Sequence, residues 1–137
     1  MTRTLSVLAV AGASLILAAT ASPQAGTTLT IRHQLRGCHS WSVNGGAYKP
    51  SQSMTLTKGA TLTIVNNDVM PHKLVKVSGP ALSLASSANM NHTSATTHVK
   101  FAKAGVYTFT TRAGEDYMKG IKTIGADNVL KLRVTVR

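Results

Sequence analysis

Apolar and polar residues alternate along much of the chain, which predicts β-strands rather than helices. The run 27–36 alternates cleanly, and its inward face is expected to carry Leu29, Ile31, His33 and Leu35. Gly37 ends this run. Residues 129–137 repeat the pattern, with inward positions at Leu130, Leu132, Val134 and Val136. The two ends of the folded region are therefore both predicted to be strands.

Turn signals divide the rest into short strands, expected at 54–57, 61–66, 72–78, 98–102 and 106–111. Asn44-Gly45-Gly46 is a strong turn signal, and Lys58-Gly59 and Gly79-Pro80 end further runs. Residues 81–97 are rich in small polar residues and predict a surface excursion with a helical turn, anchored by Leu82 and Leu84. Residues 114–128 are loop-like. About seven to eight short strands with regular turns predict an all-β, Greek-key β-sandwich.

The N-terminus is typical of a secretory signal peptide. A basic start at Arg3 precedes an almost wholly apolar run from Leu5 to Ala19, and Ala19-Thr20-Ala21 has the form of a cleavage site. The run is too short for a stable membrane span. We expect residues 1–21 to be the signal peptide, with cleavage after Ala25 as second choice, and residues 22–137 to form one exported domain. The mature protein is expected in the periplasm or outside the cell and not in the membrane.

The net charge of +11 comes from 15 Lys and Arg against 4 Asp and Glu. The cations are scattered, and the few aromatic residues cannot form a stacking platform for single-stranded nucleic acid. Together with export, this argues against nucleic acid as a partner. The charge favours solubility and attraction to an acidic redox partner protein or an anionic envelope surface.

Cys38 is the single cysteine of the chain. An exported domain with one thiol cannot form an internal disulfide, so Cys38 is expected to be buried, metal-bound or paired between molecules. An exposed thiol would be oxidised in that compartment, which favours the metal interpretation.

Four segments resemble the cupredoxins, the small blue-copper β-sandwiches. Residues 58–64 resemble the family's "KGD-T-V" strand, and Asn66-Asn67-Asp68 followed by His72 resembles its first ligand loop. Residues 101–109 are similar to its "F…PGTYTF" hairpin, and residues 116–121 to its axial-methionine segment. The resemblance covers most of residues 22–137 and implies a copper cofactor.

The sequence departs from that family at the C-terminal ligand loop. The thiolate position two residues after Tyr107-x-Phe109 holds Thr111, and no histidine occurs from 112 to 118. A standard blue-copper centre at those positions is therefore excluded.

A relocated ligand set is the leading hypothesis for a copper site: Cys38, His39, His72 and Met118. In the resembling fold the first strand runs parallel to the strand before the ligand loop. Residues 37–39 should then lie beside His72, with Met118 arriving from the C-terminal loop. A thiolate, two imidazoles and a thioether form a set that copper takes in electron-transfer sites. Both Cys38 and His39 can face one ion only if Gly37 permits a loop there.

Other candidates remain open. His33 is either the second imidazole, a hydrogen-bonding partner of a ligand, or a histidine satisfied at the core edge. Met70-x-His72 and Met90-x-His92 suit Cu(I). Glu115 or Asp116 offers an oxygen ligand or pairs with Lys and Arg. Trp41 is expected to plug the core.

No hydrolytic motif, paired carboxylates or phosphate loop occurs, so no enzymatic activity is expected. The sequence favours an exported copper-binding protein acting as a small electron carrier. The first alternative is Cu(I) storage or delivery, suggested by the Met-His pairs. The second is a metal-free sandwich that acts as an interaction domain through its basic surface.

Overall fold

The computed structural model describes residues 26–33, 39–113 and 130–137. The expected signal peptide and its cleavage sites lie outside these residues. One sheet has four strands in the order β2 (His39–Val43), β1 (Thr27–His33), β4 (Thr61–Asn66) and β7 (Ala95–Lys100). Strand β1 pairs parallel with β4, as the resemblance implied, and antiparallel with β2.

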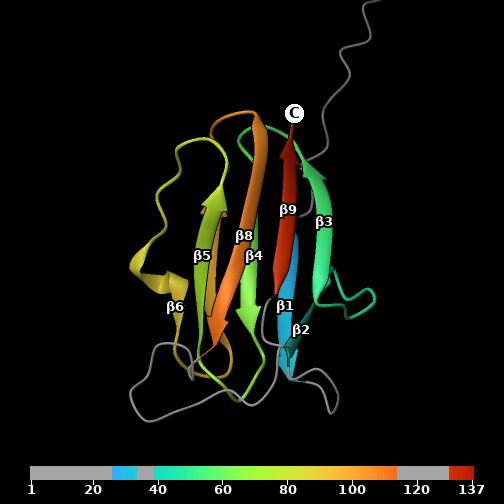
Figure 1. The fold of residues 1–137 in the computed structure, drawn as a ribbon, viewed down its shortest axis with the longest axis vertical. Helices are drawn as coiled ribbons and strands as arrows, with labels where there is room; N and C mark the ends of the chain where they lie inside the picture. Colours follow the sequence, from blue (N-terminus) through green and yellow to red (C-terminus); the bar gives the residue numbers. More distant parts are fainter. Residues whose placement is uncertain (1–25, 34–38, 114–129) are drawn as a thin grey trace, which may run out of the picture.

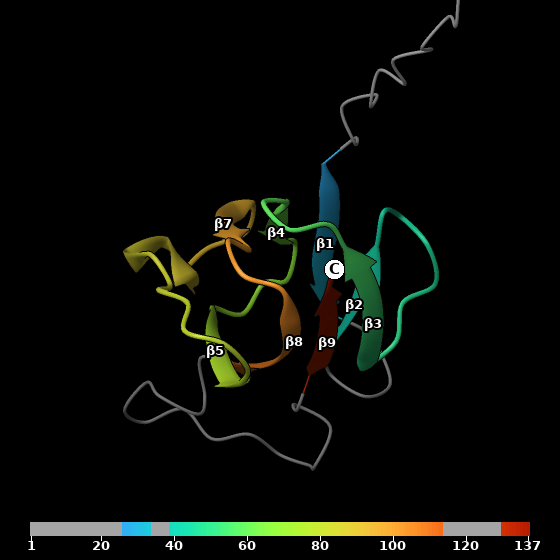
Figure 2. The same ribbon diagram turned by 90° about the horizontal axis from the view of Figure 1, so that it is seen from above.

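The second sheet has five strands in the order β3 (Ser51–Leu56), β9 (Lys131–Val136), β8 (Gly105–Ala113), β5 (His72–Ser78) and β6 (Asn89–Met90). Strand β3 pairs parallel with β9, and the other pairs are antiparallel. The two sheets form two layers whose strands run along the long axis of the molecule (Figures 1 and 2).

The core lies between the two layers and contains the predicted inward positions of residues 29, 31, 130, 132, 134 and 136, while Leu35 lies outside the described residues. Leu29 and Ile31 of β1 are fully buried, as are Leu130 and Val134 near the C-terminus. Each such side chain stabilises the fold by roughly 1.5–3 kcal/mol relative to an exposed one. Trp41 is also fully buried and packs in the core, as expected. The same core holds a group of three aromatic rings. The centroid of the Phe101 ring lies 5.0 Å from that of Tyr107 and 6.1 Å from that of Phe109.

The strands at 61–66 and 72–78 have the predicted bounds, but the bounds expected of other strands were wrong. Residues 39–43, to which no strand was assigned from the sequence, form β2, and Trp41 and its neighbours pair with β1. Strand β7 begins at Ala95 rather than at residue 98, and it turns the polar Thr97 inward. The excursion is therefore shorter than expected. It contains the helical turn η1 (Ser86–Ala88), and Leu82 and Leu84 pack against the core.

No helix in the described part of the chain is long and apolar enough to cross a membrane.

Candidate metal centre

The turn between β4 and β5 crosses from one sheet to the other at the lower end of the sandwich in Figure 1. Buried Asn66 holds this turn in shape. Its side-chain amide donates to the carbonyl oxygens of Met70 at 3.0 Å and of Met90 at 3.1 Å, and its Oδ1 accepts from the Asp68 amide at 3.0 Å. The Asp68 carboxylate in turn accepts from the Met70 amide at 2.9 Å. These four bonds hold Asp68 in the interior at this end of the sandwich. We call this end, with Asp68, His39 and His72, the pole.

Asp68 contacts histidines from both sheets. Its Oδ2 lies 2.6 Å from Nδ1 of His39, the first residue of β2, and 3.3 Å from Nε2 of His72, the first residue of β5. All three side chains are buried. The imidazole rings of His39 and His72 are perpendicular, with centroids 4.6 Å apart. One carboxylate oxygen thus contacts two imidazoles. The fold brings together the two histidines of the predicted ligand set, His39 and His72.

The carboxylate of Asp68 is held ionised. Burial raises the pKa of Asp68, but the hydrogen bonds from His39, His72 and the Met70 amide outweigh burial and hold the pKa well below its usual range. Asp68 is the single carboxylate side chain among the described residues, and it is fully buried. In a strongly basic protein, this carboxylate pairs with imidazoles rather than with Lys or Arg.

His33 lies at the rim of this cluster. As the last residue of β1 it is the register partner of His39, so the two side chains share a face, and their ring centroids are 5.9 Å apart. The His33 Nδ1 is 3.9 Å from Oδ1 of Asp68. The prediction of an inward His33 was wrong in part: its side chain is 49% exposed. This residue is the last of β1.

His72 has the features of a ligand whose second nitrogen is available. The side chain is fully buried, and its Nδ1 has no hydrogen-bond partner within the described parts of the chain. A buried imidazole nitrogen left in this state costs about 1–3 kcal/mol unless another group occupies it. Met90 of β6 is the register partner of His72 and is also fully buried, so thioether and imidazole lie on one face. This donor set fits copper.

Met90 and His92, which were predicted to act as a pair, lie in different environments. His92 is exposed, and its Nδ1 contacts the carbonyl oxygen of Thr93 at 2.9 Å, whereas Met90 is in the core. Thr111, at the position where the resembling family has its thiolate, is buried near the end of β8. Its Oγ1 has no hydrogen-bond partner among the residues that the structure describes.

The other predicted ligands, Cys38 and Met118, lie outside the described residues, as do Glu115 and Asp116. Asp68 is not in the predicted ligand set, although it lies in the segment that resembles the first ligand loop. One signal was available: Asp68 is an acidic residue four positions before the candidate ligand His72, in a chain with only four acidic residues.

The chain resembles solved copper proteins in structure. A purple cupredoxin from Nitrosopumilus maritimus matches at 20% identity over 80% of this chain and 98% of its own, with a TM-score of 0.46. Amicyanin from Paracoccus versutus matches at 15% identity over 85% of each chain, with a TM-score of 0.43. The McoA multicopper oxidase from Aquifex aeolicus matches at 13% identity over 83% of this chain and 27% of its own, with a TM-score of 0.50.

No protein-family model matches the sequence, and no curated protein matches it significantly. At these identities the structural likeness concerns the fold alone. The two-sheet topology, with the oxidase match, shows that the chain has a cupredoxin-like β-sandwich fold. This confirms the fold that the sequence resemblance implied.

Proposed function

We propose that this protein is an exported copper-binding protein that holds copper at the histidine pole and works as a small electron carrier. The observation that supports it most is His72: a fully buried imidazole with Nε2 against Asp68 and Nδ1 without a partner among the described residues. Copper-ligating histidines typically keep one nitrogen on a carboxylate or carbonyl and give the other to the metal.

The proposed ligands are His72 and His39, with Cys38 and Met118 as the predicted thiolate and thioether. Asp68 binds no copper in this scheme. It accepts a hydrogen bond from each imidazole, sets which nitrogen carries the proton, and keeps the rings perpendicular. When bound, copper would supply one-electron redox chemistry. The Asn66 hydrogen bonds would keep the ligands in place in both oxidation states.

Cu(I) storage or delivery is the alternative, and the position of Met90 favours it. A buried thioether on the same face as His72 offers a soft donor that prefers Cu(I). Reversible redox with an intense thiolate–copper absorption would support the electron carrier. Tight, colourless Cu(I) binding that Met90→Leu weakens would support the alternative.

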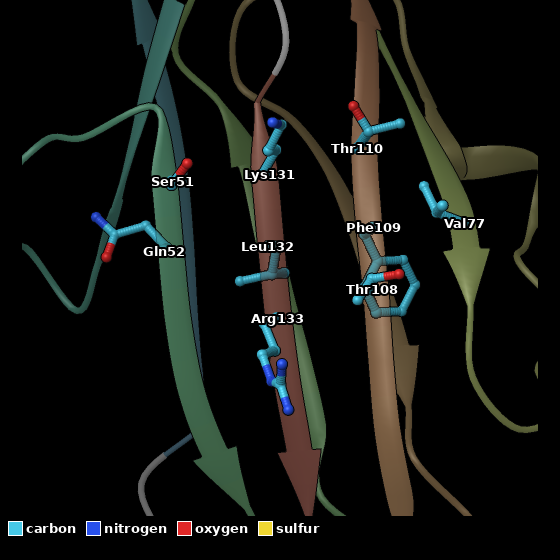
Figure 3. A pocket seen from close by; sticks show the side chains of 9 residues that line it. All are labelled: Ser51, Gln52, Val77, Thr108, Phe109, Thr110, Lys131, Leu132 and Arg133. Carbon is cyan, nitrogen blue, oxygen red and sulfur yellow. The ribbon is translucent and has the colours of Figure 1, made fainter.

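An acidic redox partner is proposed because the described surface has no acidic side chain to oppose its cations. The outer face of the five-stranded sheet has an open pocket of about 440 Å³, lined by Lys131 and Arg133 of β9 beside Thr108 and Thr110 of β8. Val77 of β5 adds an apolar side chain that is 64% exposed. Figure 3 shows the two cations along β9 between the β3 and β8 residues.

Charge reversal tests this face. Lys131→Glu with Arg133→Glu should slow electron exchange with an acidic partner and reduce its dependence on salt, because steering by opposite charges is lost. Lys58→Glu with Lys103→Glu, two exposed lysines away from this pocket, is the matched control for net charge. Equal effects of the two pairs would show that only net charge matters, and the docking proposal for this face would fail.

The experiment for the copper centre adds Cu(II) to the purified domain and records its visible spectrum, beside Cys38→Ser and His72→Ala. An intense band at roughly 400–600 nm, where thiolate-to-copper charge transfer falls, should vanish in Cys38→Ser. His72→Ala should reduce copper stoichiometry. The metal-free interaction domain would instead bind no stoichiometric copper, and both variants would behave as wild type.

A further inference from the structure

We propose that His33, His39 and Asp68 form a second metal site, overlapping the proposed copper centre, which takes a borderline divalent cation such as Zn(II). Each of the three residues offers one ligand atom, and these atoms lie within 4.8 Å of one another. The strand register supplies the two histidines as direct neighbours, and the β4–β5 turn supplies the carboxylate. Three elements therefore converge on one point at the rim of the pole.

The donor atoms favour a borderline divalent cation. Two imidazoles and a carboxylate are nitrogen and oxygen donors, a set that Zn(II) takes in sites with an open fourth position. The copper centre proposed above needs soft sulfur donors instead. Asp68 Oδ2 faces His39 and His72, and its Oδ1 lies 3.9 Å from His33 Nδ1. That separation is too long for a hydrogen bond but close to the roughly 3.3 Å between ligand atoms around one Zn(II) ion.

The site has one open side. His39 and Asp68 are buried, while the His33 side chain is 49% exposed. An ion held here can take water in its remaining position and exchange with solvent, unlike one held at fully buried His72. His39 and Asp68 are shared with the proposed copper centre, so the two metals should compete. His33 belongs to this site alone, and substitutions there test it without touching the copper ligands.

Zn(II) titration of the metal-free domain by calorimetry is the test, with His33→Ala as the variant and His92→Ala as control. His92 is another exposed histidine, outside the cluster. Wild type and His92→Ala should bind one Zn(II) alike, and His33→Ala should bind it at least roughly tenfold more weakly. Equal affinity in His33→Ala and wild type, or no Zn(II) bound by wild type, would overturn the site. Unchanged thermal melting of both variants would exclude unfolding as the cause.

Imidazole ¹⁵N chemical shifts give a second readout. Zn(II) should move the ring-nitrogen signals of His33 and His39 and leave those of His92 and His98 in place. Movement of all histidine signals to a similar extent would indicate scattered surface binding and overturn the proposal. The result is independent of the thiolate–copper band: Zn(II) binding that depends on His33 can coexist with a failed copper proposal, and the reverse also holds.

Discussion

The imidazoles of His39 and His72 stand perpendicular at a centroid distance of 4.6 Å, although they come from different sheets. His39 begins β2 in the four-stranded sheet, and His72 begins β5 in the five-stranded sheet. Asp68 lies in the turn that connects the sheets and contacts both rings. Among the described residues, a buried polar group therefore links the two sheets at this end of the sandwich, and a satisfied network of this kind rigidifies a core.

Replacing Asp68 with Asn should weaken copper binding roughly 10–100-fold, since partners that orient ligating histidines have effects of that size. The amide has one acceptor oxygen where the carboxylate has two, so it cannot accept from the imidazoles and from the Met70 amide at once, and it carries no charge. The loss of charged hydrogen bonds should also lower the free energy of unfolding by about 1–3 kcal/mol. Chelator competition and urea unfolding measure the two effects. Copper affinity equal to that of wild type would show that Asp68 has only a structural part.

Asp68 also predicts acid sensitivity. Its pKa in the folded protein is depressed below the value of about 3.9 expected in the unfolded chain. The carboxylate therefore contributes its full stability above about pH 4, and this contribution is lost as pH falls through the lower folded pKa. As pH falls from about 4 to about 2, wild type should lose more unfolding free energy than Asp68→Asn, measured by urea unfolding at each pH. Parallel pH profiles would contradict this, and comparing the two proteins cancels the remaining carboxylates.

Strands of strict alternation could be predicted from the sequence, and β4 and β5 have the bounds expected of them. Local chemistry decides such segments: β-branched residues at alternate positions, with turn residues at the ends. Strand β7 begins at Ala95, earlier than expected. Its start was missed because Thr97, which is 1% exposed, is a polar residue in a buried position. Alternation of hydrophobicity cannot detect such an inward threonine.

The pole could be predicted in part. The parallel pairing of β1 with β4 placed the segment around His39 near His72, and both lie in one cluster. The part played by Asp68 could not be predicted, because its contact with His39, 29 residues earlier in the chain, depends on β2 pairing with β1.

Trp41 offers an optical probe of the copper proposal. It is the single tryptophan, fully buried, and two residues after His39 on β2, so both side chains point to the same face roughly 7 Å apart along the strand. Cu(II) bound at His39 should quench most of the Trp41 fluorescence, whereas Zn(II), which has no redox chemistry, should not. Fluorescence titration measures this. Quenching that persists in His72→Ala and His39→Ala would place the copper elsewhere.

Two glycines at the ends of strands separate backbone strain from steric clash. Gly59 (φ +88°) has open space where the Cβ of a larger residue would lie, so Gly59→Ala should cost about 1–2 kcal/mol for the positive φ alone. Gly79 (φ +110°) would place a Cβ 2.6 Å from the carbonyl oxygen of Val106, so Gly79→Ala should cost about 1–3 kcal/mol more. Urea unfolding compares them. Equal losses of unfolding free energy would mean that the backbone around Gly79 shifts to accommodate the Cβ at no measurable cost.

The lack of acidic side chains on the described surface has a consequence for how this domain behaves among ions. Folding gathers the cations of residues 26–33, 39–113 and 130–137 onto one small body, while the single carboxylate side chain is withdrawn into the interior. Over the whole chain, 15 Lys and Arg face 4 Asp and Glu, so mobile anions of the solvent must neutralise most of the excess positive charge. In dilute buffer, repulsion among the cations should lower the stability of the folded domain. Moderate salt should screen this repulsion beyond a Debye length of about 8–10 Å. The native environment of this domain therefore sets part of its stability through its ionic strength.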